Sequence, residues 1–364
     1  MGEEGGAACE GVRAVALVND DGVILARILL GAPCFPVGWG SRIRLLSTAS
    51  SARSRYTSVK WVPAYRWNAQ LFREYSAIRA ALRAPGMSAP MDAMSAWPPK
   101  SVQHRQPLDA IVGTPGPTQS ILVRYVEPSS GKPCAVAKVM VSRGDFASER
   151  IEAESNALQD PRVCWLVPRH REVGIVDGHH YLVTDFVSGP SISPRRGIQK
   201  AAEALGFQKQ NAEIVGIQEH PWIQRALQRV PWLKKECLVG RFAITRTHGD
   251  FAPWNILKQR GGDLTLIDWE FSEPDGVAGV DLVHYLLVTK QLLGRQDPRT
   301  AVRTTAAELH DLEGVNSDEA RTLMALAAAS VLMRDPHLEP ENANHFWCRV
   351  IELCQYQSEK TIAF

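Results

Sequence analysis

Polar side chains with the types and spacing for chemistry on a phosphate lie in residues 248–268. Asp250 and Asn255 share one short segment, with four residues between them. Two strand-like runs flank the turn residues Gly261-Gly262-Asp263, which predicts a β-hairpin that returns Asp268 to the side of Asn255. The Asp250 carboxylate is then free to orient a hydroxyl. The remaining amide oxygen and second carboxylate are the hard oxygen ligands that Mg²⁺ takes. The pattern therefore predicts a site for phosphoryl transfer.

The same residues have the form of a known family signature. They stand at fixed separations, as His248-Gly249-Asp250, Asn255 and Ile267-Asp268. This set resembles the signature of the aminoglycoside phosphotransferase and choline kinase family, small-molecule kinases with a protein-kinase-like fold. Gly249 replaces the arginine of protein kinases, and Trp269-Glu270 stands where they have Phe-Gly, so both departures favour a small-molecule kinase. The alternative is a helix-capping aspartate beside a surface hairpin, since short motifs also match by chance.

The family resemblance implies the fold, the cofactors and the roles of the motif. We expect a bilobal α+β fold, with an antiparallel small lobe, a mainly helical large lobe, and ATP and Mg²⁺ in the cleft between them. Asp250 would orient and partly deprotonate an acceptor hydroxyl, while Asn255 and Asp268 hold Mg²⁺. The predicted division is an N-terminal extension of unknown role (1–100), a small nucleotide-binding lobe (101–188), and a large lobe with the catalytic and substrate-binding residues (189–364).

A lysine upstream of the motif stands in the middle of an apolar run. Residues 134–141 predict a buried strand around Lys138, and Ser120–Val126 predicts the strand that pairs with it. A lysine in such a run is unexpected unless it has a partner. The resemblance implies that Lys138 holds the α- and β-phosphates of ATP and pairs with a glutamate on the next helix. The alternative is a lysine on an edge strand that points to solvent.

The partner glutamate should lie on the helix predicted from Phe146 to Leu158. Glu149, Glu152 and Glu154 all belong to this segment. We favour Glu154, because Leu158 follows it four residues later on the same helix face. Glu152 is the close alternative, and the choice among the three stays open.

Residues 112–120 are rich in glycine and small hydroxyl side chains, and they precede the strand pair. The candidate phosphate-binding residues are Gly113, Gly116, Thr118 and Ser120. Backbone N–H groups in such a loop can face phosphates. No Gly-Lys-Ser/Thr follows, so this is not a Walker A loop, and two prolines remove backbone donors. It resembles the shorter phosphate loop of the aminoglycoside kinases, and an ordinary turn is the alternative.

The region between the predicted lobes is a strand that ends in Asp185-Phe186-Val187. By its order along the chain it matches the hinge, whose backbone groups would hydrogen-bond the adenine. Asp281 is a candidate helix N-cap, and it resembles a family aspartate that braces the catalytic loop. His248 is interpreted as a hydrogen-bonding residue of that loop and not as a base. Helical patterning is found at Gln199–Leu205, Pro221–Leu238 with a break at Pro231, 281–293, Ser317–Met333 capped by Ser317, and Phe346–Gln357.

The first hundred residues are not explained by the kinase motifs. Residues 12–30 predict a β-hairpin with an Asp-Gly turn, Trp67–Ala84 predicts a helix, and Pro85–Lys100 has the composition of a linker. The segment is interpreted either as an extension packed on the small lobe or as a separate module.

Composition fits an intracellular enzyme of this kind. The 364 residues are 45% hydrophobic and 22% charged, and the formal net charge is +2, so nothing favours nucleic acid or an acidic membrane surface as a partner. The seven scattered cysteines lack metal-ligand spacing and do not suggest a disulfide framework, which fits a reducing cytoplasm. The N-terminus lacks the pattern of a signal peptide, and no apolar stretch is long enough to span a bilayer.

The acceptor is predicted only by class. A sugar-like or aminoglycoside-like hydroxyl compound comes first, and an amino alcohol such as choline or ethanolamine comes second. Several ammonium groups would need carboxylates, for which the candidates are Glu270, Glu273, Asp275, Asp335, Glu339 and Glu341. A quaternary ammonium would need aromatic faces, for which the candidates are Trp254, Trp269 and Phe271. Two other classes stay open, namely a non-catalytic nucleotide-binding scaffold and a metal-dependent phosphoesterase.

Overall fold

Alternating apolar residues build the antiparallel sheet of the small lobe. The computed structural model describes residues 21–39, 42–62, 64, 67–82, 89, 91–92, 94, 97–193, 197–208, 212–334 and 345–356. The strands are β1 (Phe35–Trp39), β2 (Arg42–Ser47), β3 (Gln106–Val112), β4 (Ser120–Val126), β5 (Pro133–Met140), β6 (His170–Val176) and β7 (His179–Asp185). They form one seven-stranded sheet in the order β1-β2-β3-β4-β5-β7-β6. All neighbouring strands in it are antiparallel.

The two faces of this sheet have different roles. On β4, Ile121, Val123 and Tyr125 are fully buried in the core that α1 (Asp21–Leu30) covers. Successive side chains of a strand point to opposite faces. Leu122 of β4 and Lys138 of β5 therefore face the other way, and both line a cleft between the lobes.

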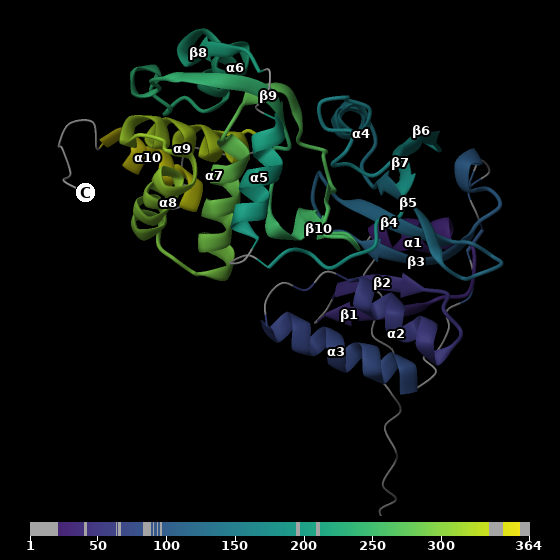
Figure 1. Ribbon diagram of the computed structural model, residues 1–364. Helices are drawn as coiled ribbons and strands as arrows, with labels where there is room; N and C mark the ends of the chain where they lie inside the picture. The colour runs from purple at the N-terminus through teal and green to yellow at the C-terminus, as the bar shows by residue number, and fades with distance from the viewer. Residues whose placement is uncertain are drawn as a thin grey trace, which may run out of the picture.

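The N-terminal segment is part of this lobe. β2 pairs with β3, so β1 and β2 extend the sheet beyond its first long hairpin. Helices α2 (Ala52–Trp61) and α3 (Trp67–Leu82) pack against β1 and β2, with Phe35, Leu45 and Val59 in a shared core. Figure 1 shows both helices beside β1 and β2. The elements described between residues 21 and 82 thus share the sheet and its cores, while the division of the chain at residue 100 stays a prediction.

The hairpin predicted over residues 12–30 is wrong for its second half, because residues 21–30 form helix α1. Val23, Leu25, Ala26, Leu29 and Leu30 are buried on that helix, and this near-continuous apolar run fits a buried helix as well as a strand. Residues 12–20 lie outside the described residues, as do most of residues 85–96 of the predicted linker. The helix predicted at Trp67–Ala84 is confirmed as α3.

The large lobe is mainly helical (Figure 1). Its helices are α5 (Ile198–Gln208), α6 (Pro221–Arg229), α7 (Val280–Val288), α8 (Pro298–Glu313), α9 (Ser317–Leu332) and α10 (Phe346–Tyr356). Its strands are β8 (Ile214–Gly216), β9 (Arg241–Thr247), β10 (Ile256–Lys258), β11 (Leu264–Leu266) and β12 (Glu273–Val277). The prediction of an α+β fold with an antiparallel small lobe and a helical large lobe is confirmed.

Helix ends correct two predictions and confirm a third. Gly279, not Asp281, is the N-cap of α7, and Asn316, not Ser317, caps α9 through a capping box with Glu319. α6 ends at Arg229, directly before Val230 and Pro231, as the predicted break requires. No helix in the described ranges is both long and apolar enough to cross a membrane.

Candidate active site

The cleft between the lobes encloses about 880 Å³. Residues of β4, β5 and β7 line one side, and residues that follow the hinge and the β10–β11 hairpin line the other. Of the predicted site residues, the lining includes Ser120, Lys138, Glu154, Asp185, Phe186, Val187, Asn255 and Asp268. A cavity of this size is within the range of ligand-binding pockets.

Lys138 lies at the centre of a buried cluster of carboxylates. Its Nζ is 2.9 Å from Glu154 Oε2, 2.5 Å from Asp268 Oδ1 and 2.8 Å from Glu270 Oε2. Burial alone would lower the pKa of Lys138, but the charges of these carboxylates outweigh it and raise the pKa well above its ordinary value. The lysine is therefore held as a cation. Among the glutamates of helix α4 (Asp145–Leu158), Glu154 is the one that contacts it.

The β10–β11 hairpin brings Asp268 beside Asn255. Ile256 pairs with Leu266 in this hairpin, and the Ile267 N–H donates to the Asn255 carbonyl at 2.9 Å. Asp268 follows directly, with a left-handed φ of 69° that turns the chain out of the strand. Its side chain is 41% exposed, although the lysine that it contacts is buried. A carboxylate at this position is accessible to a ligand in the cleft.

Asp250 lies on the loop before this hairpin and is tied to its neighbours. The Asn255 Nδ2 group donates to the Asp250 carbonyl and to Asp250 Oδ2, both at 2.9 Å. Asp250 Oδ1 is 3.0 Å from Arg334 Nη1 and 3.3 Å from His284 Nε2. Burial alone would raise the pKa of Asp250, but His284 and Arg334 outweigh it and hold the pKa far below its ordinary value. The carboxylate is therefore ionised at neutral pH.

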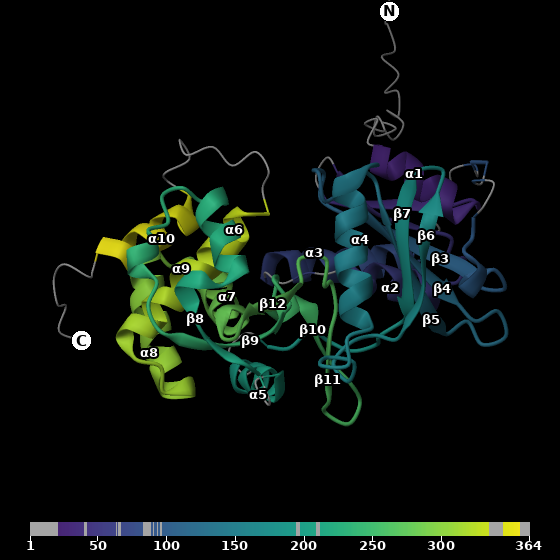
Figure 2. The same ribbon diagram turned by 90° about the horizontal axis from the view of Figure 1, so that it is seen from above.

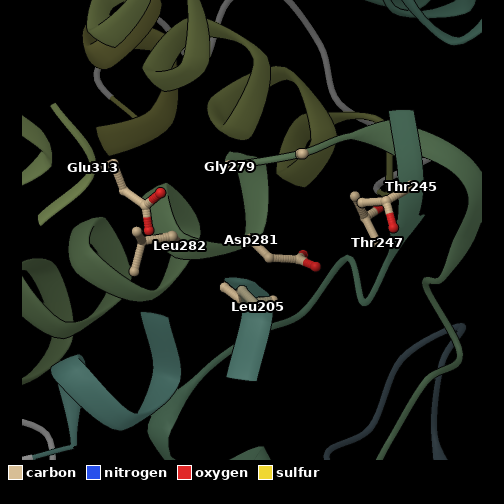
Figure 3. A pocket seen from close by; sticks show the side chains of 8 residues that line it. Leu205, Thr245, Thr247, Gly279, Asp281, Leu282 and Glu313 are labelled. Carbon is tan, nitrogen blue, oxygen red and sulfur yellow. The ribbon is translucent and has the colours of Figure 1, made fainter. Parts of the chain in front are cut away.

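The backbone of this loop is fixed from behind by Asp281, on the first turn of α7. The His248 N–H donates to Asp281 Oδ2 at 2.7 Å, and the Gly249 N–H donates to Asp281 Oδ1 at 3.0 Å. Figure 3 shows the Asp281 side chain at a small cavity of about 10 Å³, near Thr245 and Thr247 of β9. Gly249 has φ 79°, and a Cβ there would lie 2.1 Å from the Phe271 carbonyl oxygen. An arginine at position 249 is thus excluded by both backbone conformation and space.

The His248 ring links the loop to the strand before Asp268. Its Nδ1 lies 3.2 Å from the Asp250 N–H, and its Nε2 lies 2.9 Å from the Ile267 carbonyl oxygen. These contacts fit a ring that accepts at Nδ1 and donates at Nε2. His248 is 1% exposed, so the geometry supports the structural interpretation of this residue.

The hinge residues lie at the far end of the cleft from Lys138 and Asp268. Asp185 N–H donates to the Arg169 carbonyl and Phe186 N–H donates to the Cys134 carbonyl, so both of these backbone donors are occupied. Val187 N–H has no backbone acceptor within the described part of the chain, and Val187 lines the cleft. Of the three hinge residues, Val187 is therefore the one whose backbone N–H makes no backbone hydrogen bond within the described residues.

The predicted phosphate loop lies between β3 and β4. Ser120 lines the cleft, but Gly113, Gly116 and Thr118, all within the described ranges, are not among its lining residues. Gly113 N–H donates to the Ser120 carbonyl, so this donor closes the loop and does not face the cleft. Only the last residue of the predicted loop thus reaches the site in this structure.

Solved structures of small-molecule kinases resemble this chain. A choline kinase from Streptococcus pneumoniae is 16% identical, covers 70% of this chain and 95% of its own, and has a TM-score of 0.44. An ethanolamine kinase from Plasmodium vivax is 11% identical, covers 84% of this chain and 95% of its own, and has a TM-score of 0.43. The GDP complex of aminoglycoside 2'-phosphotransferase-IIIa is 13% identical, covers 72% and 96%, and has a TM-score of 0.41. No family model and no curated protein matches the sequence.

Two groups of charged residues in the site were not predicted in these roles. Glu270 is named above only as an acceptor ligand, but it contacts Lys138. The available signal was its position in the sequence, two residues after Asp268. Arg334 and His284 contact Asp250 from sequence positions 84 and 34 residues away, and no local pattern marks them.

The donor set fits a magnesium ion that is shared with a phosphate ligand. Asn255 uses its Nδ2 on Asp250, which leaves Oδ1 available to a cation. Asp268 uses Oδ1 on Lys138, which leaves Oδ2. Among the described residues, no group of three or more His, Cys, Asp or Glu side chains forms a complete metal site. Mg²⁺ commonly takes one or two protein oxygens together with phosphate oxygens and water, so two protein ligands suffice.

Proposed function

We propose that this protein is an ATP-dependent small-molecule kinase that transfers the γ-phosphoryl group to an alcohol group of its acceptor. The observation that carries the proposal is the convergence of Lys138, Glu154 and Asp268 in one cluster, in which the lysine and the glutamate are buried. These residues come from β5, α4 and the end of β11, and they meet at one end of a cleft that the hinge closes at the other. Nucleotide phosphates at that end would meet a lysine oriented by a glutamate.

In this proposal each residue has one role. Lys138 holds the α- and β-phosphates and is oriented by Glu154. Asn255 and Asp268 hold Mg²⁺, which would neutralise phosphate oxygens. Asp250 holds the acceptor hydroxyl in line with the γ-phosphate, and its low pKa makes positioning its main contribution. His248 and Asp281 fix the loop that carries Asp250.

Carboxylates in the described residues favour a neutral sugar-type acceptor over a polycationic aminoglycoside. Glu270 contacts Lys138, Glu273 contacts Arg225 at 2.9 Å, and Asp275 lies 3.8 Å from Arg162. Each of these three candidates for ammonium binding already faces a cation of the protein. The other candidates, Asp335, Glu339 and Glu341, lie outside the described residues.

The aromatic candidates give little support to the alternative, a choline- or ethanolamine-type kinase. Trp269 is fully buried, with its Nε1–H bonded to the Leu266 carbonyl. Phe271 is already covered by the guanidinium groups of Arg150 and Arg334, at 4.6 and 4.8 Å from the ring centroid. Only Trp254 among the three lines the cleft.

An ATP-consumption screen across neutral sugars, aminoglycosides and amino alcohols tests the proposal. We expect turnover with a hydroxyl compound in the presence of Mg²⁺ and loss of that turnover in Lys138→Ala. A thermal-shift series without acceptor separates the other classes. Stabilisation by MgATP without turnover on any acceptor supports the non-catalytic scaffold. Stabilisation by Mn²⁺ alone, without an effect of nucleotide, supports the phosphoesterase and contradicts the kinase.

A further inference from the structure

The loop end of the α2–α3 hairpin forms a wall of the cleft that neither the motifs nor the proposed roles account for. Lys60 and Trp61 at the end of α2, Ala64 in the connection, and Gln70 and Arg73 on the first turns of α3 all line the 880 Å³ cavity. Leu293 lines it from the large lobe. Figures 1 and 2 show α3 extending toward the large lobe from the small lobe.

The hairpin is held in place by the sheet. β2 pairs with β3 in register, with Leu45 opposite Ile111, and Ile111 both lines the cleft and packs on the core under α2 and α3. Arg55 Nε also donates to the Ala80 carbonyl at 2.6 Å, which ties α2 to α3. The hairpin therefore has a fixed position relative to the strands that bound the cleft.

The contacts of Trp61 place the hairpin at the hinge end of the cleft. The Arg124 guanidinium of β4 lies 4.5 Å from the Trp61 ring and 5.8 Å from the Phe186 ring, so the tryptophan is a near neighbour of the hinge. Arg124 is itself fixed by a buried pair with Asp109. Lys138 and Asp268 mark the opposite, phosphate end. A nucleotide whose phosphates lie there would place its nucleoside beside Trp61.

Arg73 adds an unused donor at the same place. Its Nη1 donates to the Val62 carbonyl at 3.3 Å, which holds the guanidinium next to Trp61. Its Nε is buried and has no hydrogen-bond partner in the described part of the chain. The Arg73 side chain lines the cleft, so its guanidinium can donate to a ligand there.

We propose that the α2–α3 hairpin is part of the nucleotide site, in which Trp61 covers the nucleoside and Arg73 donates to it. This inference rests on the proposed function and deepens it, because it assigns nucleoside contacts to the N-terminal segment. Trp61 offers a half-buried aromatic face for stacking, and Arg73 offers planar donors to a base edge or to ribose hydroxyls.

Calorimetric titration with two ligands tests the assignment. MgATP and magnesium tripolyphosphate share the phosphate chain, but only MgATP has a nucleoside. We expect Arg73→Gln and Trp61→Leu each to weaken MgATP binding about tenfold, as expected for losing a hydrogen bond to a charged donor or an aromatic face, and to leave tripolyphosphate binding unchanged. Arg79→Gln is the matched control, because Arg79 is an exposed arginine on the same helix. Lys138→Ala should weaken both ligands.

Four outcomes would overturn the inference. MgATP affinity that is unchanged in both hairpin variants would show that the hairpin does not contact the nucleotide. Equal weakening of both ligands would place the effect on the phosphates or on the cleft as a whole. Weakening of MgATP by Arg79→Gln as well would show a general effect of α3. Wild-type protein that binds tripolyphosphate and MgATP equally weakly would overturn the proposed function itself, and this inference with it.

Discussion

The charged centres around Lys138 and Asp250 have opposite compositions. Lys138 is one ammonium group among three carboxylates, those of Glu154, Asp268 and Glu270. Asp250 is one carboxylate that faces the Arg334 guanidinium and the His284 imidazole, whose pKa burial lowers. The first centre thus has excess negative charge, which a cation such as Mg²⁺ would balance. In the second centre, Arg334 already balances the charge of the carboxylate.

The pKa shifts in the two centres also differ. Burial, followed by the charge of Asp268, raises the pKa of Glu270 to about 7 in spite of its contact with Lys138. A carboxylate beside an ammonium group normally has a lowered pKa. Burial alone would raise the pKa of Asp250, but His284 and Arg334 outweigh it and hold that pKa far below its ordinary value. The centre around Lys138 therefore contains a carboxylate whose charge is disfavoured, and a further cation would stabilise it.

The largest expected effect concerns the catalytic loop. Asp250→Asn should lower kcat by about 10²–10⁴, because hydroxyl positioning and general-base help are both lost, while MgATP affinity stays nearly intact. The measurement is kcat beside nucleotide affinity in the same variant, with an acceptor from the screen. A near-normal kcat contradicts the role of Asp250. A large loss of nucleotide affinity that does not depend on acceptor points to a metal ligand and to the phosphoesterase.

The next effect tests the excess of carboxylates around Lys138. Asp268→Asn should remove the Mg²⁺-dependent part of ATP binding, a loss on the order of 100-fold, because the neutral amide is a poor ligand beside Asn255. Calorimetric titrations of ATP with and without Mg²⁺ measure that part directly. Unchanged affinity and stoichiometry for MgATP would count against a metal-binding role for Asp268.

Asp160 and Asp275 face two arginines outside the cleft, and this balanced cluster provides the reference for both centres. Asp160, after α4, lies 2.5 Å from Arg246 of β9 and 2.8 Å from Arg162. Burial alone would raise the pKa of Asp160, but Arg162 and Arg246 outweigh it and lower the pKa. This depressed pKa gives stability that is present above the unfolded-state pKa, near 4, and is lost as pH falls through the folded-state pKa.

Asp160→Asn should therefore lower the free energy of unfolding by about 2 kcal/mol at pH 7, and the deficit should shrink on acidification below about pH 4. MgATP affinity should not change, since no ligand is needed to balance this cluster. Denaturant melts at several pH values and one titration with MgATP measure both quantities. A deficit that is constant with pH would show that the loss is steric and not electrostatic.

The sequence was sufficient where function depends on local order along the chain. The hairpin that joins Asn255 to Asp268, the strand that contains Lys138 and the helix that contains Glu154 all depend on periodicity and turn residues, and all are present. Even the choice of Glu154 follows from helix geometry, since residues three or four apart share a face. The division of the chain into lobes at residues 100 and 188 stays a prediction.

What the sequence could not supply depends on packing between distant segments. No local pattern brings Arg334 and His284 to Asp250, or Trp61 and Arg73 to the hinge. The helix at residues 21–30 was missed because its apolar run has neither a clear two-residue nor a clear 3.6-residue period. Asp281 is not the cap of α7, and its bonds to the backbone N–H groups of His248 and Gly249 fit the bracing role that only the family resemblance implied.

The smallest expected effect concerns Arg334, whose guanidinium contacts Asp250. Arg334→Gln removes the cation that lies 3.0 Å from Asp250 Oδ1, so the pKa of Asp250 should rise toward its ordinary value. Turnover needs the ionised carboxylate and is lost as pH falls through this pKa, so the acid limb of the kcat profile should move to higher pH. At pH 7.5 the carboxylate remains ionised, and we expect kcat to fall less than about tenfold. Arg349→Gln, at an exposed position of α10, is the matched control. An acid limb that does not move, together with a raised KM for the acceptor, would instead show that Arg334 binds the acceptor and does not set the charge of Asp250.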